Sequence, residues 1–180
     1  MKHLAVVVDW YGPYPLDAAL MKAKSMDRGL YLGLGKIRCQ RGPARPQYIG
    51  LTTCFGSRLG NHHKLPSITQ KPEFWLGVVA TVNVPGKATK KTPPSLDYAE
   101  WVHAYFLNLP LNERKKKNPP SRPVTVLNRW WRTDSERQRF KRPNQAWPDL
   151  IDYQGREHVT RLVWFGIKQQ KRRPPYEAQV

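Results

Sequence analysis

Short runs of apolar residues alternate with polar stretches rich in Gly and Pro along most of the chain. Runs of this kind, bounded by turn residues and rich in aromatic and β-branched side chains, predict β-strands. We expect strands at residues 4–8, 29–35, 47–52 and 73–84, and the last of these has the strongest β-branched character. Farther along, residues 149–168 predict a hairpin that turns near Gly155.

A second pattern, with apolar residues three and four positions apart, predicts a helix within residues 93–112. Its apolar stripe consists of Leu96, Ala99, Val102, Phe106 and Leu109. Ser95 is a suitable N-cap, and Pro110 ends the pattern. Shorter helices are expected at residues 15–26 and 54–65. The order of these elements favours an α+β fold in which a small antiparallel β-sheet is flanked by helices.

Composition supports a single compact domain. The 180 residues are 39% hydrophobic, which is enough for a modest core. The 31 Lys and Arg residues outnumber the 13 Asp and Glu residues and give a net charge of +18. This excess indicates a polyanionic partner, and duplex DNA is the leading one. A membrane surface is disfavoured, because the chain has no basic amphipathic helix and its longest uncharged apolar run, residues 74–82, is too short to span a bilayer.

The two cysteines, Cys39 and Cys54, do not form a disulfide framework pattern, so we expect a reducing, cytoplasmic location. Asp9 also interrupts the first apolar run before a signal peptide could form. Together with His62 and His63 the cysteines offer four zinc ligands. Their spacing does not match structural zinc sites, in which two cysteines lie two to four positions apart.

Two of the predicted strands contain similar tripeptides, Gly29-Leu30-Tyr31 and Tyr48-Ile49-Gly50, and several polar residues follow them in the chain. Arg58 lies ten positions after Tyr48, His62 four positions after Arg58, and Asn112 twelve positions after Glu100, within the sequence LPLN. In this order the residues resemble the motifs of the GIY-YIG nuclease family over about residues 29–112.

This resemblance implies a three-stranded antiparallel core at residues 28–112. Residues 1–27 would add a strand and a helix, and residues 113–180 a basic extension that contains the hairpin. The sequence departs from the family in one respect: Tyr48 lies seventeen positions after Tyr31, farther than the usual hairpin allows. The additional residues are basic and rich in Pro and Gly, and we interpret them as a loop that contacts DNA.

The resemblance also implies a metal-dependent DNA endonuclease of the stand-alone, restriction or mobile-element type. The catalytic residues would be Tyr31, Tyr48, Arg58, His62, Glu100 and Asn112. A tyrosine, Tyr31 for preference, would accept the proton of the attacking water. Arg58 and His62 would stabilise the phosphate, and Glu100 would hold one Mg²⁺, with Mn²⁺ as a substitute. His63 competes with His62 for its role.

The chemistry of these residue types suits phosphodiester hydrolysis. A carboxylate is the ligand that Mg²⁺ prefers, and a guanidinium matches the geometry of phosphate oxygens. Each residue also has an ordinary structural explanation, because Tyr is common in strands and exposed Arg is common on surfaces. The alternative is therefore a non-catalytic nucleic-acid-binding protein, including a ribonucleoprotein component. The oligomeric state is open, a dimer included.

Residues 113–142 contain eleven Lys or Arg and three acidic residues, together with two adjacent tryptophans. We interpret this region and the long loop after Tyr31 as DNA-docking surfaces. The residues expected to contact DNA are Lys36, Arg38, Arg41, Arg45, Lys115, Lys116, Lys117, Arg129 and Arg132.

Overall fold

The structure is a computed structural model that describes residues 2–60, 62–81, 93–133, 137–166 and 168–172. Its strands are β1 (Leu4–Tyr14), β2 (Gly29–Ile37), β3 (Arg45–Thr52), β4 (Ile68–Val79), β5 (Val124–Trp131), β6 (Leu150–Tyr153), β7 (Thr160–Trp164) and β8 (Lys168–Arg172). Its helices are α1 (Leu16–Ala23), α2 (Phe55–Gly60) and α3 (Pro94–Phe106), with a 3₁₀ turn at Leu65–Ser67.

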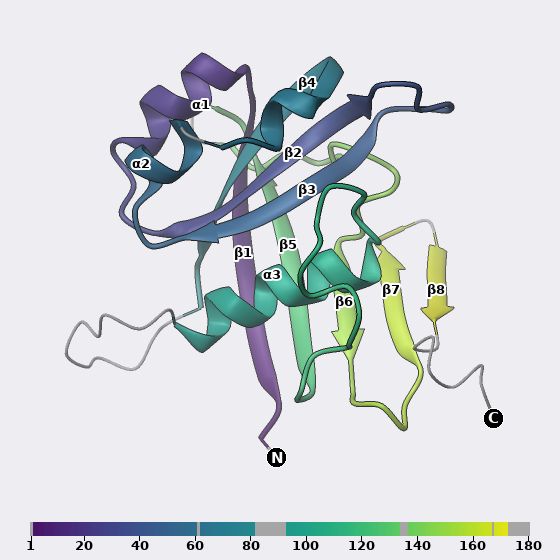
Figure 1. Ribbon diagram of the computed structural model, residues 1–180. Coiled ribbons are helices and arrows are strands. Elements are labelled where there is room, and N and C mark those ends of the chain that lie inside the picture. Colours follow the sequence, from purple (N-terminus) through teal and green to yellow (C-terminus); the bar gives the residue numbers. More distant parts are fainter. Residues whose placement is uncertain (1, 61, 82–92, 134–136, 167, 173–180) are drawn as a thin grey trace.

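All described strands belong to one sheet of eight, in the order β3-β2-β4-β1-β5-β6-β7-β8 (Figure 1). Neighbouring strands are antiparallel except β1 and β5, which run parallel from Leu4–Val124 to Tyr11–Trp131. In β1 the buried Val6, Val8 and Trp10 share one face, whereas Ala5 and Val7 on the other face are exposed and half-buried. Among the described residues, no helix is long and apolar enough to cross a membrane.

Each face of the sheet has its own hydrophobic cluster. Helix α3 lies across one face, in front of β1 and β5 in Figure 1, and packs on Val6, Val8 and the tryptophans of the core. Helices α1 and α2 sit together on the other face, where they cover Tyr31, Phe74 and neighbouring side chains. Helices α2 and α3 therefore lie on opposite faces of the sheet, whose edge strand is β3.

The expectation of a small three-stranded antiparallel core flanked by helices is wrong. β2, β3 and β4 are antiparallel neighbours, but they continue into a larger mixed sheet through β1 and β5. The predicted N-terminal strand lies at the centre of that sheet. The strand β5 was not predicted, because its alternation of buried and half-buried residues lies within a region whose composition is dominated by charge. The expected hairpin is present as β6 and β7, with Gly155 in the connection at a φ of +116°.

A tryptophan cluster fills the core beneath α3. Trp147 packs edge-to-face against Trp10, Trp75 and Trp130, with ring centroids 4.9, 6.0 and 4.5 Å away. His103 of α3 is fully buried beside this cluster. Its ring nitrogens lie 2.7 Å from the Ala99 carbonyl oxygen and 3.1 Å from the Asn128 side-chain oxygen. Burial lowers the pKa of His103 to about 4, so the ring is neutral at physiological pH.

Candidate active site

The two motif tyrosines lie on adjacent strands of the face that α2 covers. Tyr31 on β2 is directly opposite Gly50 on β3, and Tyr48 is opposite Gly33. The rings of Tyr31 and Tyr48 are 5.9 Å apart between centroids. A Cβ at position 50 would lie 2.4 Å from the Tyr31 ring and hydroxyl. Glycine at this position is therefore what allows the Tyr31 ring to lie across β3.

His62 completes a compact aromatic group with the tyrosines. Its imidazole centroid lies 4.6 Å from that of Tyr48 and 5.4 Å from that of Tyr31, edge-on to both. The backbone N–H groups of Lys64 and Leu65 donate to Nδ1 at 3.2 and 3.3 Å. Because Nδ1 accepts, the neutral ring carries its proton on Nε2. His62 therefore presents a hydrogen-bond donor at Nε2.

His63 occupies a different environment from His62. Its ring stacks on that of His62, with centroids 5.7 Å apart and planes 5° from parallel. It is exposed, whereas His62 is buried. The geometry thus distinguishes the two candidates for the histidine role: His62 contacts the tyrosines, and His63 lies on the outer side of this group.

Glu100 projects from α3 toward the edge of β3. One carboxylate oxygen accepts from the backbone N–H of Leu51 at 3.2 Å, and the other lies 2.5 Å from the ammonium of Lys115. The same ammonium is 2.6 Å from a carboxylate oxygen of Asp97, one turn earlier on α3. A cation therefore already bridges two carboxylates at the position expected to bind a metal. Lys115 has a φ of +61°, which is uncommon for a residue with a side chain.

The side chain of Asn112 forms hydrogen bonds with the backbone of β3, which the sequence motif did not predict. Its side-chain oxygen accepts from the Ile49 N–H at 2.9 Å, and its side-chain nitrogen donates to the Ile49 carbonyl at 2.8 Å. The amide thereby imitates a neighbouring strand. The Leu111 N–H also donates to the Gln47 carbonyl at 3.0 Å. Together with Glu100, this segment satisfies the outer edge of β3.

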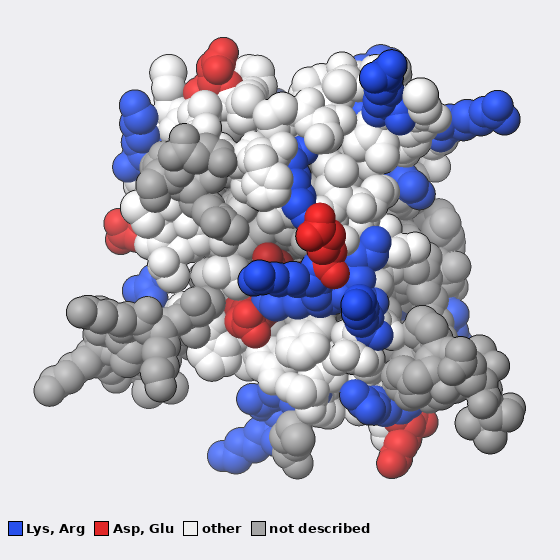
Figure 2. Space-filling model, in the orientation of Figure 1, with Lys and Arg blue, Asp and Glu red and all other residues white. Residues whose placement is uncertain are grey.

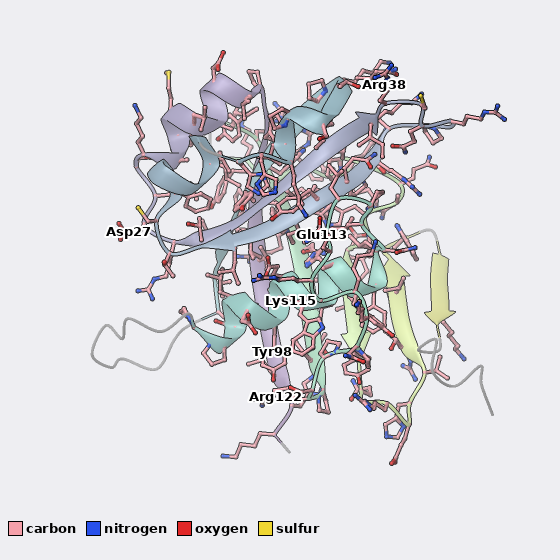
Figure 3. The ribbon with its side chains drawn as sticks, in the orientation of Figure 1. Asp27, Arg38, Tyr98, Glu113, Lys115 and Arg122 are labelled. Carbon is pink, nitrogen blue, oxygen red and sulfur yellow. The ribbon has the colours of Figure 1, made fainter. Side chains whose placement is uncertain are left out.

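A cavity of about 610 Å³ opens between β3, α3 and the segment after it. It is lined by Tyr48, Leu51, His63, Lys64, Asp97, Glu100, Asn112, Glu113, Arg114 and Lys115. Figure 3 shows Glu113 and Lys115 lying between β3 and α3, and Figure 2 shows acidic and basic side chains meeting at the centre of this face. The Lys64 ammonium is 2.8 Å from the Glu113 carboxylate, and this hydrogen bond lowers the pKa of Glu113.

The structure brings some of the predicted site residues together and leaves others apart. Tyr48, Glu100 and Asn112 line the cavity, and His62 contacts Tyr48 from behind. Tyr31 is 2% exposed and is not among the lining residues. Arg58 is on α2, but its side chain lies outside the described part of the structure. Asp97 and Lys64 were missed as site residues. Asp97 offered a signal, because it precedes Glu100 by three positions and such residues share a helix face.

The residues expected to contact DNA lie in three places. Arg38, Arg41 and Arg45 are exposed around the tip of the β2–β3 hairpin, and Lys36 is half-buried near the same end of β2. Lys115 and Lys116 are engaged internally, whereas Lys117 is exposed. Arg129 is held by Asp9 through two hydrogen bonds of 2.6 and 2.7 Å. Arg132 is exposed just beyond β5.

Two carboxylates are available at the position expected to bind a metal. Asp97 and Glu100 both offer carboxylate oxygens to one point, which the Lys115 ammonium occupies. Oxygen ligands of this kind suit Mg²⁺. Cys39 and Cys54 are exposed. Within the described residues, no group of three or more His, Cys, Asp or Glu side chains is arranged to hold a metal ion, either at Glu100 or at the cysteines.

Comparisons with protein-family models, with curated proteins and with solved structures found no match for this chain.

Proposed function

We propose that this protein is a metal-dependent nuclease that hydrolyses phosphodiester bonds in DNA at the cavity beside β3. One observation carries the proposal. Tyr48 and Glu100, which are more than fifty positions apart in the chain, line one cavity, and His62 packs against Tyr48 behind it. An aromatic hydroxyl and a carboxylate are groups that can serve proton transfer and cation binding.

Tyr48 is the better candidate for the group that accepts a proton from the attacking water. It lines the cavity, whereas Tyr31 is buried behind it. Lys64 and Arg114, which can contact phosphate oxygens, line the same cavity. Tyr31 and His62 then act by positioning Tyr48, since both rings pack against it.

Glu100, with Asp97, is the group that would hold Mg²⁺. When bound, the cation would supply positive charge to the leaving oxygen of the phosphodiester. The carboxylate oxygen that accepts from Leu51 fixes the orientation of Glu100, and the other oxygen faces Lys115. Cation binding at this oxygen requires the Lys115 ammonium to move away, because two cations cannot share the position.

The first test compares Glu100→Gln with the wild-type protein in a plasmid-nicking assay with Mg²⁺. The substitution keeps an oxygen that can accept from Leu51 and removes the negative charge. We expect nicking to fall at least 100-fold, because the charge that holds the cation is lost. Tyr48→Phe, which removes one hydroxyl, is expected to lower the rate similarly.

Glu113→Gln is the matched control. Glu113 lines the same cavity, but its carboxylate is 83% exposed and pairs with Lys64 at the rim. We expect this variant to nick DNA at a rate near that of the wild type. Absence of Mg²⁺-dependent cleavage of duplex, branched and single-stranded DNA by the wild-type protein would refute the nuclease proposal. Retained DNA binding in that case would favour the non-catalytic alternative.

A further inference from the structure

A second cavity, of about 650 Å³, lies beyond the ends of β1 and β5. It is lined by Gly12, Pro13, Arg132, Thr133, Gln138, Arg139, Phe140 and Lys141. It shares no lining residue with the cavity beside β3. Three of these residues are cationic and none is acidic. Such a cavity attracts an anion.

The fold of the chain after β5 holds these cations in place. The backbone turns back beyond Trp131, so that the Arg139 N–H donates to the Trp130 carbonyl at 2.7 Å. The Arg132 N–H donates to the Arg137 carbonyl at 3.1 Å. The Arg139 guanidinium lies 5.4 Å from the ring centroid of the buried Trp75. Arg139 is thus fixed by its backbone and by a cation–π contact.

These cations differ from other arginines of the structure in their partners. Arg129 is neutralised by Asp9, and Arg142 by Asp149 at 2.6 Å. Within the described residues, Arg132, Arg139 and Lys141 form no ion pair with a carboxylate. No described carboxylate neutralises them, as Asp9 and Asp149 neutralise the other two arginines.

Phe140 adds an apolar group to the same cavity. It lies between Arg139 and Lys141 in the chain, and its side chain is fully exposed, at 106% of the reference area. An exposed aromatic ring between two cations is an arrangement that binds single-stranded nucleic acid. The cations contact phosphates, and an unpaired base stacks on the ring.

The basic connection between β2 and β3, residues 38–44, adjoins the same region. Its tip packs on the segment that follows Lys141, where the Asn144 side-chain nitrogen donates to the Ala44 carbonyl at 2.8 Å. A third cavity, of about 480 Å³, lies at this contact and includes Arg41 and Arg45. Residues 138–141 line the cavity at the ends of β1 and β5, and residues 144–146 line this third cavity. Each cavity contains cationic side chains, so positive charge lies along the whole of residues 138–146.

We propose that residues 137–146 and the tip of the β2–β3 hairpin form a docking site for a single-stranded stretch of nucleic acid. Phosphates contact Arg132, Arg139 and Lys141, and one unpaired base stacks on Phe140. This inference rests on the proposed function in so far as nucleic acid is the substrate. It extends that function by assigning a strand-binding site separate from the cavity beside β3.

The test measures binding of fluorescein-labelled 20-nucleotide DNA, single-stranded or duplex, by anisotropy in EDTA, so that cleavage does not interfere. The double variant Arg139→Ala/Lys141→Ala is compared with Arg161→Ala/Lys171→Ala. Arg161 and Lys171 are exposed and paired on β7 and β8, in register with the beginning of β5, from which β6 separates them. The control therefore removes the same charge at the level of the opposite end of β5.

We expect the Arg139/Lys141 variant to bind single-stranded DNA at least 10-fold more weakly than the control variant. The slope of log Kd against log salt concentration should fall by about 1.4, the value for two lost phosphate contacts. Equal affinities and slopes for the two double variants would overturn the proposal. Thermal melting of both variants identifies any loss of folding.

Phe140→Ala tests the stacking contact. We expect it to weaken single-strand binding roughly 5- to 100-fold and to leave duplex binding within twofold, because only an unpaired base can stack on the ring. Met21→Ala removes a 70%-exposed apolar side chain from α1 and should change neither. An equal effect of Phe140→Ala on both DNAs, or no effect, would contradict the proposed contact.

Two further arms separate the remaining outcomes. Inorganic phosphate should displace the labelled strand only at concentrations far above those of unlabelled oligonucleotide, and equal potency would mean a simple anion site and overturn the proposal. Plasmid nicking is measured in parallel. Binding that depends on Arg139 and Lys141 without any nicking would refute the nuclease proposal alone, whereas nicking with unaltered binding by the double variant would refute the docking site alone.

Discussion

At the scale of single residues, His103 gives the clearest link between burial and stability. The unfolded chain binds a proton at this imidazole near pH 6.5, whereas burial lowers the folded-state pKa to about 4. The folded protein therefore resists protonation that the unfolded chain accepts. The contribution of this residue to stability is complete above pH 6.5 and is lost as the pH falls toward 4.

We expect the free energy of unfolding to decrease by about 3 kcal/mol more in the wild type than in His103→Leu between pH 6.5 and 4. Urea denaturation at half-unit pH intervals measures this difference. The leucine variant lacks the imidazole of His103 and keeps all other titrating groups, so it serves as the control. The same pH dependence in both proteins would show that His103 is protonated equally in the folded and unfolded states.

Asn112 requires a different experiment, because its two hydrogen bonds to Ile49 explain its position without any role in catalysis. We expect Asn112→Ala to lower the free energy of unfolding by roughly 1–3 kcal/mol, since the edge of β3 loses a donor and an acceptor. Chemical denaturation measures the loss. At a temperature where the variant is folded, its nicking rate should stay near that of the wild type. A large rate loss with unchanged stability would favour a direct role in the reaction.

At the scale of elements, the pairing of β2 with β3 depends on the absence of a side chain at position 50. We expect Gly50→Ala to destabilise the protein by roughly 1–3 kcal/mol, because the added methyl group meets the Tyr31 ring. Thermal unfolding measures the change. Gly60→Ala is the control: the nearest atom to its added Cβ is 4.0 Å away, on Leu20, and we expect little change. Equal stabilities of the two variants would mean that Tyr31 moves aside without cost.

The helices and strands also show which sequence patterns are sufficient to predict an element. β2, β3 and the stripe from Leu96 to Phe106 on α3 were predicted close to their observed positions. β1 extends six residues beyond the expected end, to Tyr14, and β4 begins five residues before the expected start, at Ile68. β5 was missed, because half of its side chains are not fully buried and its neighbours in the chain are basic. The apolar stripe reached Leu109, but α3 ends at Phe106 and the chain then turns along β3. That turn creates the cavity, and no local pattern of residues specifies it.

At the scale of the whole molecule, β1 and β5 show why the architecture could not be predicted from neighbouring elements. Parallel partners require a long connection. β1 and β5 are adjacent in the sheet, but the segment of chain that connects them contains most of the residues of the candidate site. The order of motif residues predicted that Tyr48 and Glu100 would approach each other. It could not predict that Lys115 and Asp97 would join them, because these contacts depend on how the chain returns to the edge of the sheet.

The central place of β1 leads to a prediction about the isolated fragment 28–112. This fragment lacks β1, with the buried Val8 and Trp10, and also β5 to β8, so β4 loses its partner on one side. We expect the fragment to lack a cooperative thermal transition and to give a poorly dispersed amide NMR spectrum, in contrast to the full chain. A cooperatively folded fragment would instead show that β2, β3 and β4 form an independent core.

The closure of the β3 edge by Glu100 has a further consequence for spectroscopy. The two oxygens of this carboxylate have separate tasks, since one accepts from the backbone of Leu51 and the other faces a cation. Replacement of the Lys115 ammonium by Mg²⁺, as proposed above, would change the electron density on both oxygens. We therefore expect the amide chemical shift of Leu51 to change during a Mg²⁺ titration, and an unchanged shift would contradict binding of the cation at Glu100.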